Sequence, residues 1–131
     1  MPRSYKDFKI YGCFTLNRLV SELDIDLYQD DLEEKLDRIL GPEAPGLSKE
    51  DVKHEIMSNH FMTNKVLESL EAEGLIKVEQ HDGRYVVKIT KEGVLYIRKY
   101  NEFFFSLYKD QIHQHYRYRG LPRWARGIGK E

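Results

Sequence analysis

The sequence has few of the features that mark secreted or membrane proteins. Its 131 residues include one cysteine, Cys13, so an internal disulfide is impossible. No apolar run approaches the roughly 20 residues that a bilayer-spanning helix needs. A secretory signal has a continuous apolar segment after its basic residues, and the N-terminal stretch MPRSYKDFKIYG has none. We therefore expect a cytoplasmic protein, and at this length a single core.

The sequence also lacks the motifs of common catalytic and metal sites. It has no glycine-rich phosphate loop and no carboxylate pair or triad at a spacing typical of catalysis. Its five histidines are scattered, and His113 and His115 would lie about 200° apart around a helix, which does not suit a shared metal ion. We expect no enzymatic activity, no cofactor and no metal.

Charge is nearly balanced overall but unevenly distributed. The net charge of −1 argues against a protein that coats nucleic acid without regard to sequence. Residues 22–37 contain eight acidic side chains against Lys35 alone, whereas residues 111–131 are predominantly basic. With 40% hydrophobic and 33% charged residues, the composition indicates a soluble globular protein rich in helix.

Apolar residues at helical spacing predict helices along the first half of the chain. Leucines and a valine from Leu16 to Leu23 predict a helix over residues 15–24, and a second such set predicts one over 30–40 that ends at Gly41-Pro42. After the loop GPEAPG, Ser48 is an expected N-cap for a short helix over 48–57.

A turn and a hairpin follow this short helix. Asn59 is the expected cap of the next helix, over about 60–73, which Gly74 ends. LIKVEQ and YVVKIT then flank HDGR, in which Asp82-Gly83 predicts a type I′ hairpin turn. Thr90 is the expected cap of a long last helix over about 91–118, before Gly120 and Pro122.

Two short helices joined by a three-residue turn and followed by a hairpin form the winged helix-turn-helix arrangement. Residues 30–97 resemble the winged-helix transcription regulators, the broad group that includes the MarR, PadR and ArsR types. The residues that carry the resemblance run from the end of one helix to the start of the next: Leu70, Glu71, Glu73, Gly74, Leu75, Ile76, Thr90 and Gly93.

The predicted fold is mainly α-helical with a small antiparallel β-hairpin. Its expected parts are an N-terminal helical extension (1–29), the winged helix-turn-helix domain (30–92), a long C-terminal helix for dimerisation (93–118) and a basic tail (119–131). Function is expected on the exposed side of the second short helix and at the hairpin tip.

The resemblance implies that the helix over 60–73 enters the major groove of double-stranded DNA, while the wing (77–88) contacts the backbone. The candidate DNA-binding residues are His60, Asn64, Lys65, Ser69, Lys77, His81, Arg84 and Lys88. Asn64 suits an adenine edge, and Lys65 suits a guanine or a phosphate. Glu68 would repel phosphate unless it accepts a hydrogen bond from a cytosine amine. The alternative for Asn64, Lys65 and Ser69 is an ordinary solvated helix face.

The stretch VLYIRKYNEFFFSLY carries a wide apolar band. Its members suggest a homodimer interface: Leu95, Phe103, Phe104, Leu107 and Tyr108. The alternative is that this helix packs on residues 15–24 of its own chain.

The C-terminal stretch alternates arginines with aromatic residues. Arg117, Arg119, Arg123, Trp124 and Arg126 suit either nucleic acid or a partner. The alternative is that this tail folds over the acidic residues 22–37, with Trp124 as its anchor.

Together these features favour a dimeric, sequence-specific DNA-binding transcription regulator. The alternative is a winged-helix module that binds protein in a transcription, replication or chromosome-organising assembly. A further hypothesis places a small ligand between the long helix and residues 5–16, where aromatic residues gather.

Overall fold

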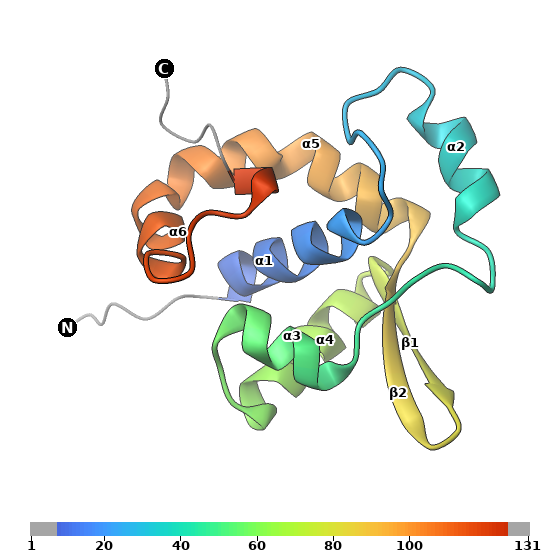
Figure 1. Ribbon diagram of the computed structural model, residues 1–131, viewed down its shortest axis with the longest axis horizontal. Helices are drawn as coiled ribbons and strands as arrows, with labels where there is room; N and C mark the ends of the chain where they lie inside the picture. The colour runs from blue at the N-terminus through green and yellow to red at the C-terminus, as the bar shows by residue number, and fades with distance from the viewer. Residues whose placement is uncertain (1–7, 126–131) are drawn as a thin grey trace.

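The computed structural model describes residues 8–125, which form helices and one hairpin (Figure 1). Among these residues, no helix is long and apolar enough to cross a membrane. The elements in chain order are α1 (Phe8–Ser21), α2 (Leu32–Ile39), α3 (Lys49–Ile56), α4 (His60–Ala72), β1 (Ile76–His81), β2 (Arg84–Ile89), α5 (Lys91–Leu107), α6 (Lys109–His115) and the 3-10 turn η1 (Arg123–Ala125). The fold is mainly α-helical with one antiparallel hairpin, as expected.

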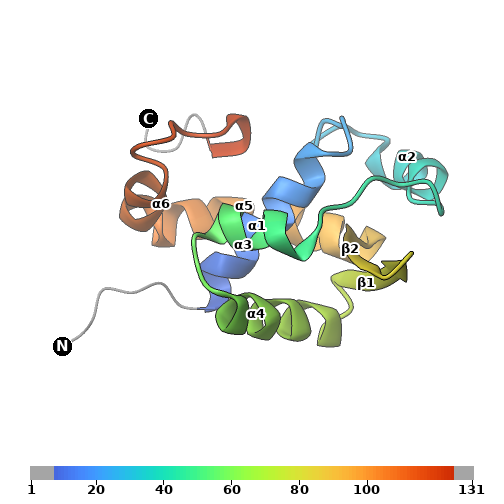
Figure 2. The ribbon, with the colours of Figure 1, turned by 60° about the horizontal axis from the view of Figure 1, so that its bottom comes forward.

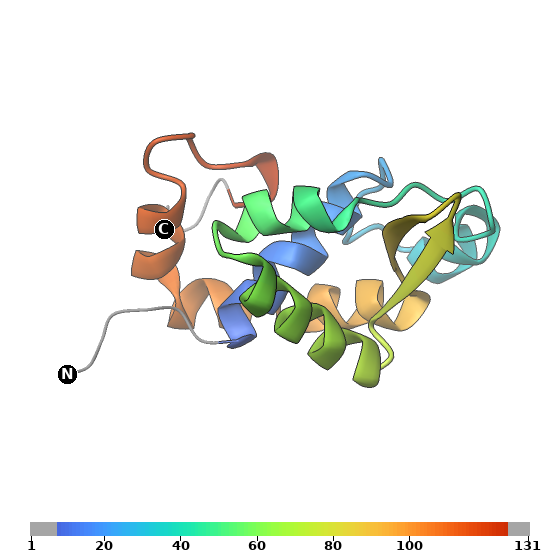
Figure 3. The same cartoon turned by 90° about the horizontal axis from the view of Figure 1, so that it is seen from below.

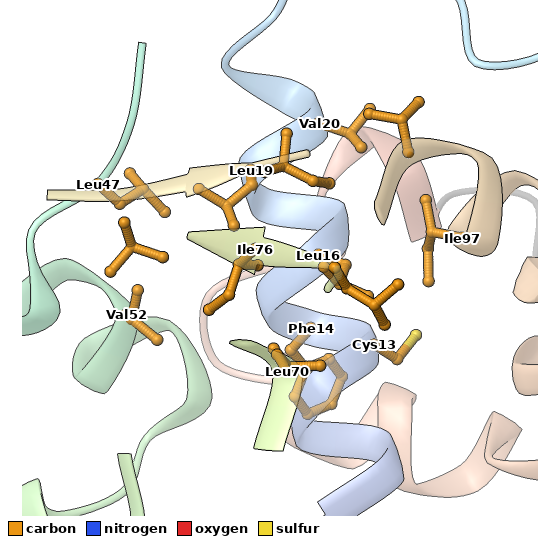
Figure 4. Close-up of a cluster of buried hydrophobic side chains, with 14 of the residues drawn as sticks. Cys13, Phe14, Leu16, Leu19, Val20, Leu47, Val52, Leu70, Ile76 and Ile97 are labelled. Carbon is orange, nitrogen blue, oxygen red and sulfur yellow. The ribbon is translucent and has the colours of Figure 1, made fainter. Parts of the chain in front are cut away.

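Helix α1 lies at the centre of the core rather than outside it. It packs against α3, α4, α5 and β2, and Phe14, Leu16 and Leu19 are almost completely buried within the cluster of Figure 4. The expected helix over 15–24 is present in part, but α1 begins earlier, at Phe8, and ends at Ser21. Within the expected extension over 1–29, this helix belongs to the core. A helix buried on several sides shows no narrow apolar stripe, so its first two turns escaped a search for one-sided periodicity.

The three expected helix caps are confirmed. The side chain of Ser48 accepts a hydrogen bond from the Asp51 amide at 2.9 Å, and that of Asn59 accepts one from the Met62 amide at 2.8 Å. Between α3 and α4 the chain reverses through Met57, whose φ of 54° is left-handed. These caps fix where the two helices of the helix-turn-helix begin.

The hairpin follows the predicted turn. Asp82 and Gly83 both have positive φ, 53° and 78°, as a type I′ turn requires. The register pairs Ile76 with Ile89 at the base and His81 with Arg84 at the tip. Leu47 extends the sheet by one residue, through two backbone hydrogen bonds to Val87 of 2.9 and 2.7 Å.

The chain turns from the hairpin into α5 at a tightly packed junction. The hydroxyl of Thr90 donates to the Gly74 carbonyl at 2.7 Å and accepts from the Gly93 amide at 3.0 Å, which caps α5 and ties its start to the end of α4. A Cβ at position 93 would lie 2.1 Å from the Leu75 carbonyl oxygen, so only glycine fits there. The cap and this contact together explain why Thr90 is followed by a glycine three residues later.

The long last helix is interrupted. Instead of one helix over 91–118, α5 ends at Leu107 and α6 begins at Lys109, with Tyr108 between them. After α6 the chain turns back over α1, through Gly120 at a φ of 82°. The break lets Ile112 and Tyr116 reach the core, where both are buried.

Helices α1 and α5 are joined by a buried amide pair. The side chains of Asn17 and Asn101 exchange two hydrogen bonds of 2.9 and 3.0 Å, and each residue is at most 2% exposed. The pair satisfies its own polar atoms only when the two helices are in this register. Packing of the long helix on α1, the alternative considered from sequence, therefore accounts for one side of the apolar band.

Candidate nucleic-acid interface

Helix α4 and the hairpin lie on the same side of the molecule. Figure 3 shows α3, α4 and the hairpin spread across one face, and in Figure 2 α4 forms the lower edge, away from α2. The inner side of α4 is buried through Val66, Leu67 and Leu70. Its outer side is open, and α2, with three acidic and two basic side chains, lies away from it (Figures 1 and 2).

The four candidate residues of α4 are all exposed: His60, Asn64, Lys65 and Ser69. His60 lies 3.9 Å from Glu50 of α3, which also binds Lys53 and His54. The pKa of Glu50 is held below its usual value, chiefly by the hydrogen bond from Lys53. The basic groups nearest the start of α4 are thus partly balanced by an acid.

The acidic residues of α4 differ in what they contact. Glu71 turns toward the wing, where its carboxylate accepts a hydrogen bond from the Val78 amide at 3.3 Å. This contact attaches the end of α4 to β1. Glu68 remains exposed on the outer side beside Lys65.

The expected wing residues share one face of the hairpin. Because opposite residues of an antiparallel pair point the same way, the register places Lys77, His81 and Arg84 together with Glu79, away from the core. Glu79 lies 3.0 Å from His81, 3.3 Å from Lys88 and 3.5 Å from Lys77. Hydrogen bonds from His81 and then Lys88 lower the pKa of Glu79 to about 2. Arg84 is exposed at the tip.

The expectation that Lys88 contacts DNA was wrong. Lys88 is 6% exposed, and its amine donates to the Pro42 carbonyl at 2.9 Å in addition to pairing with Glu79. Lys88 lies at the base of the hairpin, where the loop before α3 covers its side chain. Its place in the predicted strand did not reveal this loop.

A lysine that sequence reasoning missed joins the three elements of this face. Lys49, the first residue of α3, donates to the Asn64 side-chain oxygen at 3.2 Å. Its amine also lies 4.2 Å from the centroid of the Tyr85 ring on β2. Its place directly after the N-cap Ser48 was visible in the sequence, but its contacts depend on how α3 packs against α4 and the hairpin.

Large apolar side chains also lie on this face. Met57 in the turn is 58% exposed and Phe61 in the first turn of α4 is 67% exposed. The Lys65 amine lies 5.2 Å from the centroid of the Phe61 ring. The surface is therefore mixed, with apolar, basic and acidic groups side by side.

Two aromatic residues of the C-terminal segment, Tyr116 and Trp124, pack inward. Trp124 contacts the rings of Phe14, Phe105 and Tyr116, with centroids 5.8 to 6.3 Å away. The Tyr116 hydroxyl donates to the carboxylate of Glu55, and burial, with this hydrogen bond, raises the pKa of that hydroxyl well above its usual value. Trp124 does anchor the segment, but against α1 and α5.

The arginines of this segment have separate environments. Arg119 donates to the Glu55 carbonyl at 3.1 Å, and Arg18 pairs with the Glu55 carboxylate at 3.1 Å. Arg117 is exposed and lies over the ring of Tyr118. Arg123 borders an open cleft of about 590 Å³ whose lining includes Asp24 and Asp26. Arg126 falls outside the described residues.

The residues expected at a dimer interface are split between surface and core. Phe103 and Leu107 are 58% and 56% exposed, and Leu95 and Tyr108 are half-buried. Phe104 is only 3% exposed and packs within the chain's own core, so its expected place at an interface was wrong. An exposed strip of α5 remains.

The cavity nearest the proposed ligand position is small. It measures about 70 Å³ and is lined by residues of α1, α4 and α5, including Cys13. Phe14, one of the aromatic residues expected there, is fully buried in the core. Within the described residues, no three His, Cys, Asp or Glu side chains gather to hold a metal ion.

These elements define a winged helix-turn-helix protein. Helix α1 packs with α3 and α4, α4 leads through Gly74 into the β1–β2 wing, and Leu47 adds a short third pairing to the sheet. The order and contacts of these elements in this chain are sufficient for the fold assignment.

Comparisons with known proteins give distant likenesses. No protein-family profile matches the chain, and no curated protein matches its sequence. Among solved structures, MepR, described as a transcription regulator of a Staphylococcus aureus multidrug efflux pump, is 15% identical with a TM-score of 0.43 over 81% of this chain and 77% of its own. Sso10a-2, described as a DNA-binding protein from Sulfolobus solfataricus, is 20% identical with a TM-score of 0.44, over 69% and 93%.

Proposed function

We propose that this protein is a DNA-binding transcription regulator that places α4 in the major groove while the wing contacts the adjacent backbone. The observation that carries the proposal is the shared orientation of two exposed elements. The outer side of α4 and the tip of the hairpin are both open to solvent and lie on the same side of the molecule (Figure 3). A helix of this size fits the major groove of B-form DNA.

Each exposed side chain then has a role that its chemistry suits. Arg84 at the tip and Lys77 along β1 contact phosphates, since both carry exposed positive charge. Lys65 and Ser69 on α4 contact phosphates or base edges, and Asn64 contacts a base edge in the groove. His60 and His81 add hydrogen-bond donors at the ends of this surface.

The proposal includes a homodimer formed through α5. Phe103 and Leu107 are one turn apart on the helix and more than half exposed, which leaves an apolar strip for a second copy. A twofold dimer presents two copies of α4, and a spacing of roughly 34 Å between them matches one turn of DNA.

Salt dependence tests the DNA contacts. Titrating the full chain with duplex DNA at several salt concentrations gives a slope of log affinity against log salt. Arg84→Ala and Lys65→Ala are expected to lower the slope by about 1 each if each residue contacts one phosphate. Lys109→Ala, which removes an exposed charge from α6, serves as the control and leaves the slope unchanged. Absence of binding to any duplex at low salt contradicts the proposal.

Sedimentation tests the dimer. We expect the wild-type chain to sediment as a dimer and Phe103→Asp to sediment as a folded monomer, because a buried charge at an interface is costly. The control is Tyr118→Asp, at an exposed position outside α5. If the wild-type chain sediments as a monomer at all concentrations, the proposed dimer is contradicted and the proposed DNA contacts are not affected.

A second candidate function is a module that binds protein. Exposed Met57 and Phe61 together with Glu68 give this face a mixed character that also suits a protein partner. The duplex titration separates the two functions. Binding whose slope falls in the Arg84 and Lys65 variants favours DNA, and no binding at low salt favours a protein partner.

A further inference from the structure

Lys49 occupies a fixed position at the junction of α3, α4 and the wing. Its backbone directly follows the Ser48 cap, and the residue before Ser48 is held to β2 by the Leu47–Val87 pairing. Its side chain is half-buried, with the amine 3.2 Å from the Asn64 oxygen and 4.2 Å from the centroid of the Tyr85 ring. Three separate elements thus determine where this ammonium group lies.

The contact with Lys49 limits what Asn64 can recognise. An asparagine reads adenine with both ends of its amide, since the oxygen accepts from the adenine N6 amine while the nitrogen donates to N7. In this structure the Asn64 oxygen already accepts from Lys49. The oxygen keeps a second lone pair, but the ammonium beside it adds a positive charge, so the amide nitrogen, which only donates, is the end of the side chain better suited to face a base.

Lys49 and Asn64 together present mainly hydrogen-bond donors. An ammonium group has three N–H bonds and no acceptor, so two remain after the bond to Asn64. Among the bases, guanine presents two acceptors, O6 and N7, on its major-groove edge. We propose that Lys49 and Asn64 act as a donor pair that selects a guanine in the target duplex, in place of the adenine that Asn64 alone would favour. This inference rests on the proposed DNA-binding function.

Tyr85 has a positioning role in this arrangement. A cation near an aromatic ring is attracted to the face of the ring, so Tyr85 favours the orientation of the Lys49 amine toward Asn64. The wing therefore influences base choice on α4 without contacting the base. Removal of the ring is expected to weaken the preference for guanine, and Tyr85→Phe, which retains the ring, is expected to preserve it.

The test is selection of bound duplexes from a random library by the full chain and its variants. For the wild type we expect about a tenfold preference for guanine over adenine at one position, within the range for a specific base contact. In Lys49→Met, which retains the apolar stem, this preference falls below about twofold and adenine gains at the same position, because the Asn64 oxygen is free. Lys53→Met removes a half-buried lysine that contacts Glu50 in the same helix, and it leaves the preference unchanged.

The outcomes separate this inference from the function on which it rests. If the wild type binds no duplex, the proposed function fails and this inference fails with it. If the wild type binds duplexes but Lys49→Met selects the same bases, only the donor pair is overturned. A second measurement needs no DNA: the side-chain amide resonances of Asn64 are expected to shift in Lys49→Met and to stay in place in Lys53→Met. Unchanged resonances in both variants also overturn the pair.

Discussion

The hairpin and the C-terminal segment both place basic residues beside aromatic ones, yet these side chains have different environments. In the hairpin, Arg84 and Tyr85 are exposed at the far end of the strands. In residues 115–125, Tyr116 is 3% exposed and Trp124 contacts three other rings. The hairpin leaves these side chains open to solvent, whereas the C-terminal segment packs Tyr116 and Trp124 against the chain's own core.

The difference follows from what lies beneath each segment. The C-terminal segment crosses α1 and α3, where Phe14 offers an aromatic surface and the buried Glu55 offers a carboxylate and a carbonyl. The outer half of the hairpin extends beyond the core (Figure 1), where its side chains contact one another and, at Tyr85, Lys49 of α3. Basic residues beside aromatic ones in the sequence therefore do not distinguish an exposed surface from an internal contact.

The largest expected effect comes from removing the acid that holds the C-terminal segment. Glu55→Ala leaves the Tyr116 hydroxyl and the guanidinium groups of Arg18 and Arg119 without their carboxylate. Breaking a buried charged network from one side typically costs several kcal/mol, so we expect a loss of about 3 kcal/mol in the free energy of unfolding. Urea denaturation measures it. The control is Glu50→Ala, which removes an exposed acid of the same helix. An equal loss of stability in this variant contradicts a special role of Glu55 in holding the C-terminal segment.

A pair of aromatic substitutions compares the two segments directly. Trp124→Ala removes packing against Phe14 and Phe105 and is expected to lower the free energy of unfolding by about 2 kcal/mol, below the range for a fully buried ring because Trp124 is partly exposed. Tyr85→Ala on the wing is expected to cost about 0.5 kcal/mol or less. Thermal or urea unfolding measures both values. Similar losses in the two variants argue that the wing tip is also part of the core.

The smallest expected effect concerns the acid of the wing. The pKa of Glu79 is lowered from 4.5 to about 2 by His81 and Lys88, so its ionised form is favoured in the folded state. Its contribution to stability is therefore present above pH 4.5 and is lost as the pH falls from 4.5 toward 2. We expect the stability difference between wild type and Glu79→Gln to shrink over this interval in urea titrations. A difference that stays constant with pH contradicts the ion-pair cluster.

The parts of the fold that were predictable from sequence are those set by neighbours in the chain. The caps at Ser48, Asn59 and Thr90 and the Asp82-Gly83 turn depend on hydrogen bonds and φ values within a few residues, and all four were found as expected. The start of α1 and the break at Tyr108 depend on packing between distant segments. Local periodicity does not contain that information.

The candidate site also has a part that was predictable from local sequence and a part that was not. Exposure of Asn64, Lys65 and Arg84 followed from their place opposite the apolar positions of a helix or at a turn. Burial of Lys88 depends on Pro42, 46 residues earlier, and the role of Lys49 depends on Asn64 and Tyr85. Contacts across such separations are decided by the tertiary fold.

The single cysteine gives this fold an internal reporter. Cys13 is 1% exposed at the centre of α1, and burial raises the pKa of its thiol to about 12. Because the thiolate is the reactive form, a maleimide reagent labels this chain at neutral pH only when α1 opens. The labelling rate of the unaltered protein then measures how often the central helix leaves its place, with and without DNA, and no mutation is needed to introduce the probe.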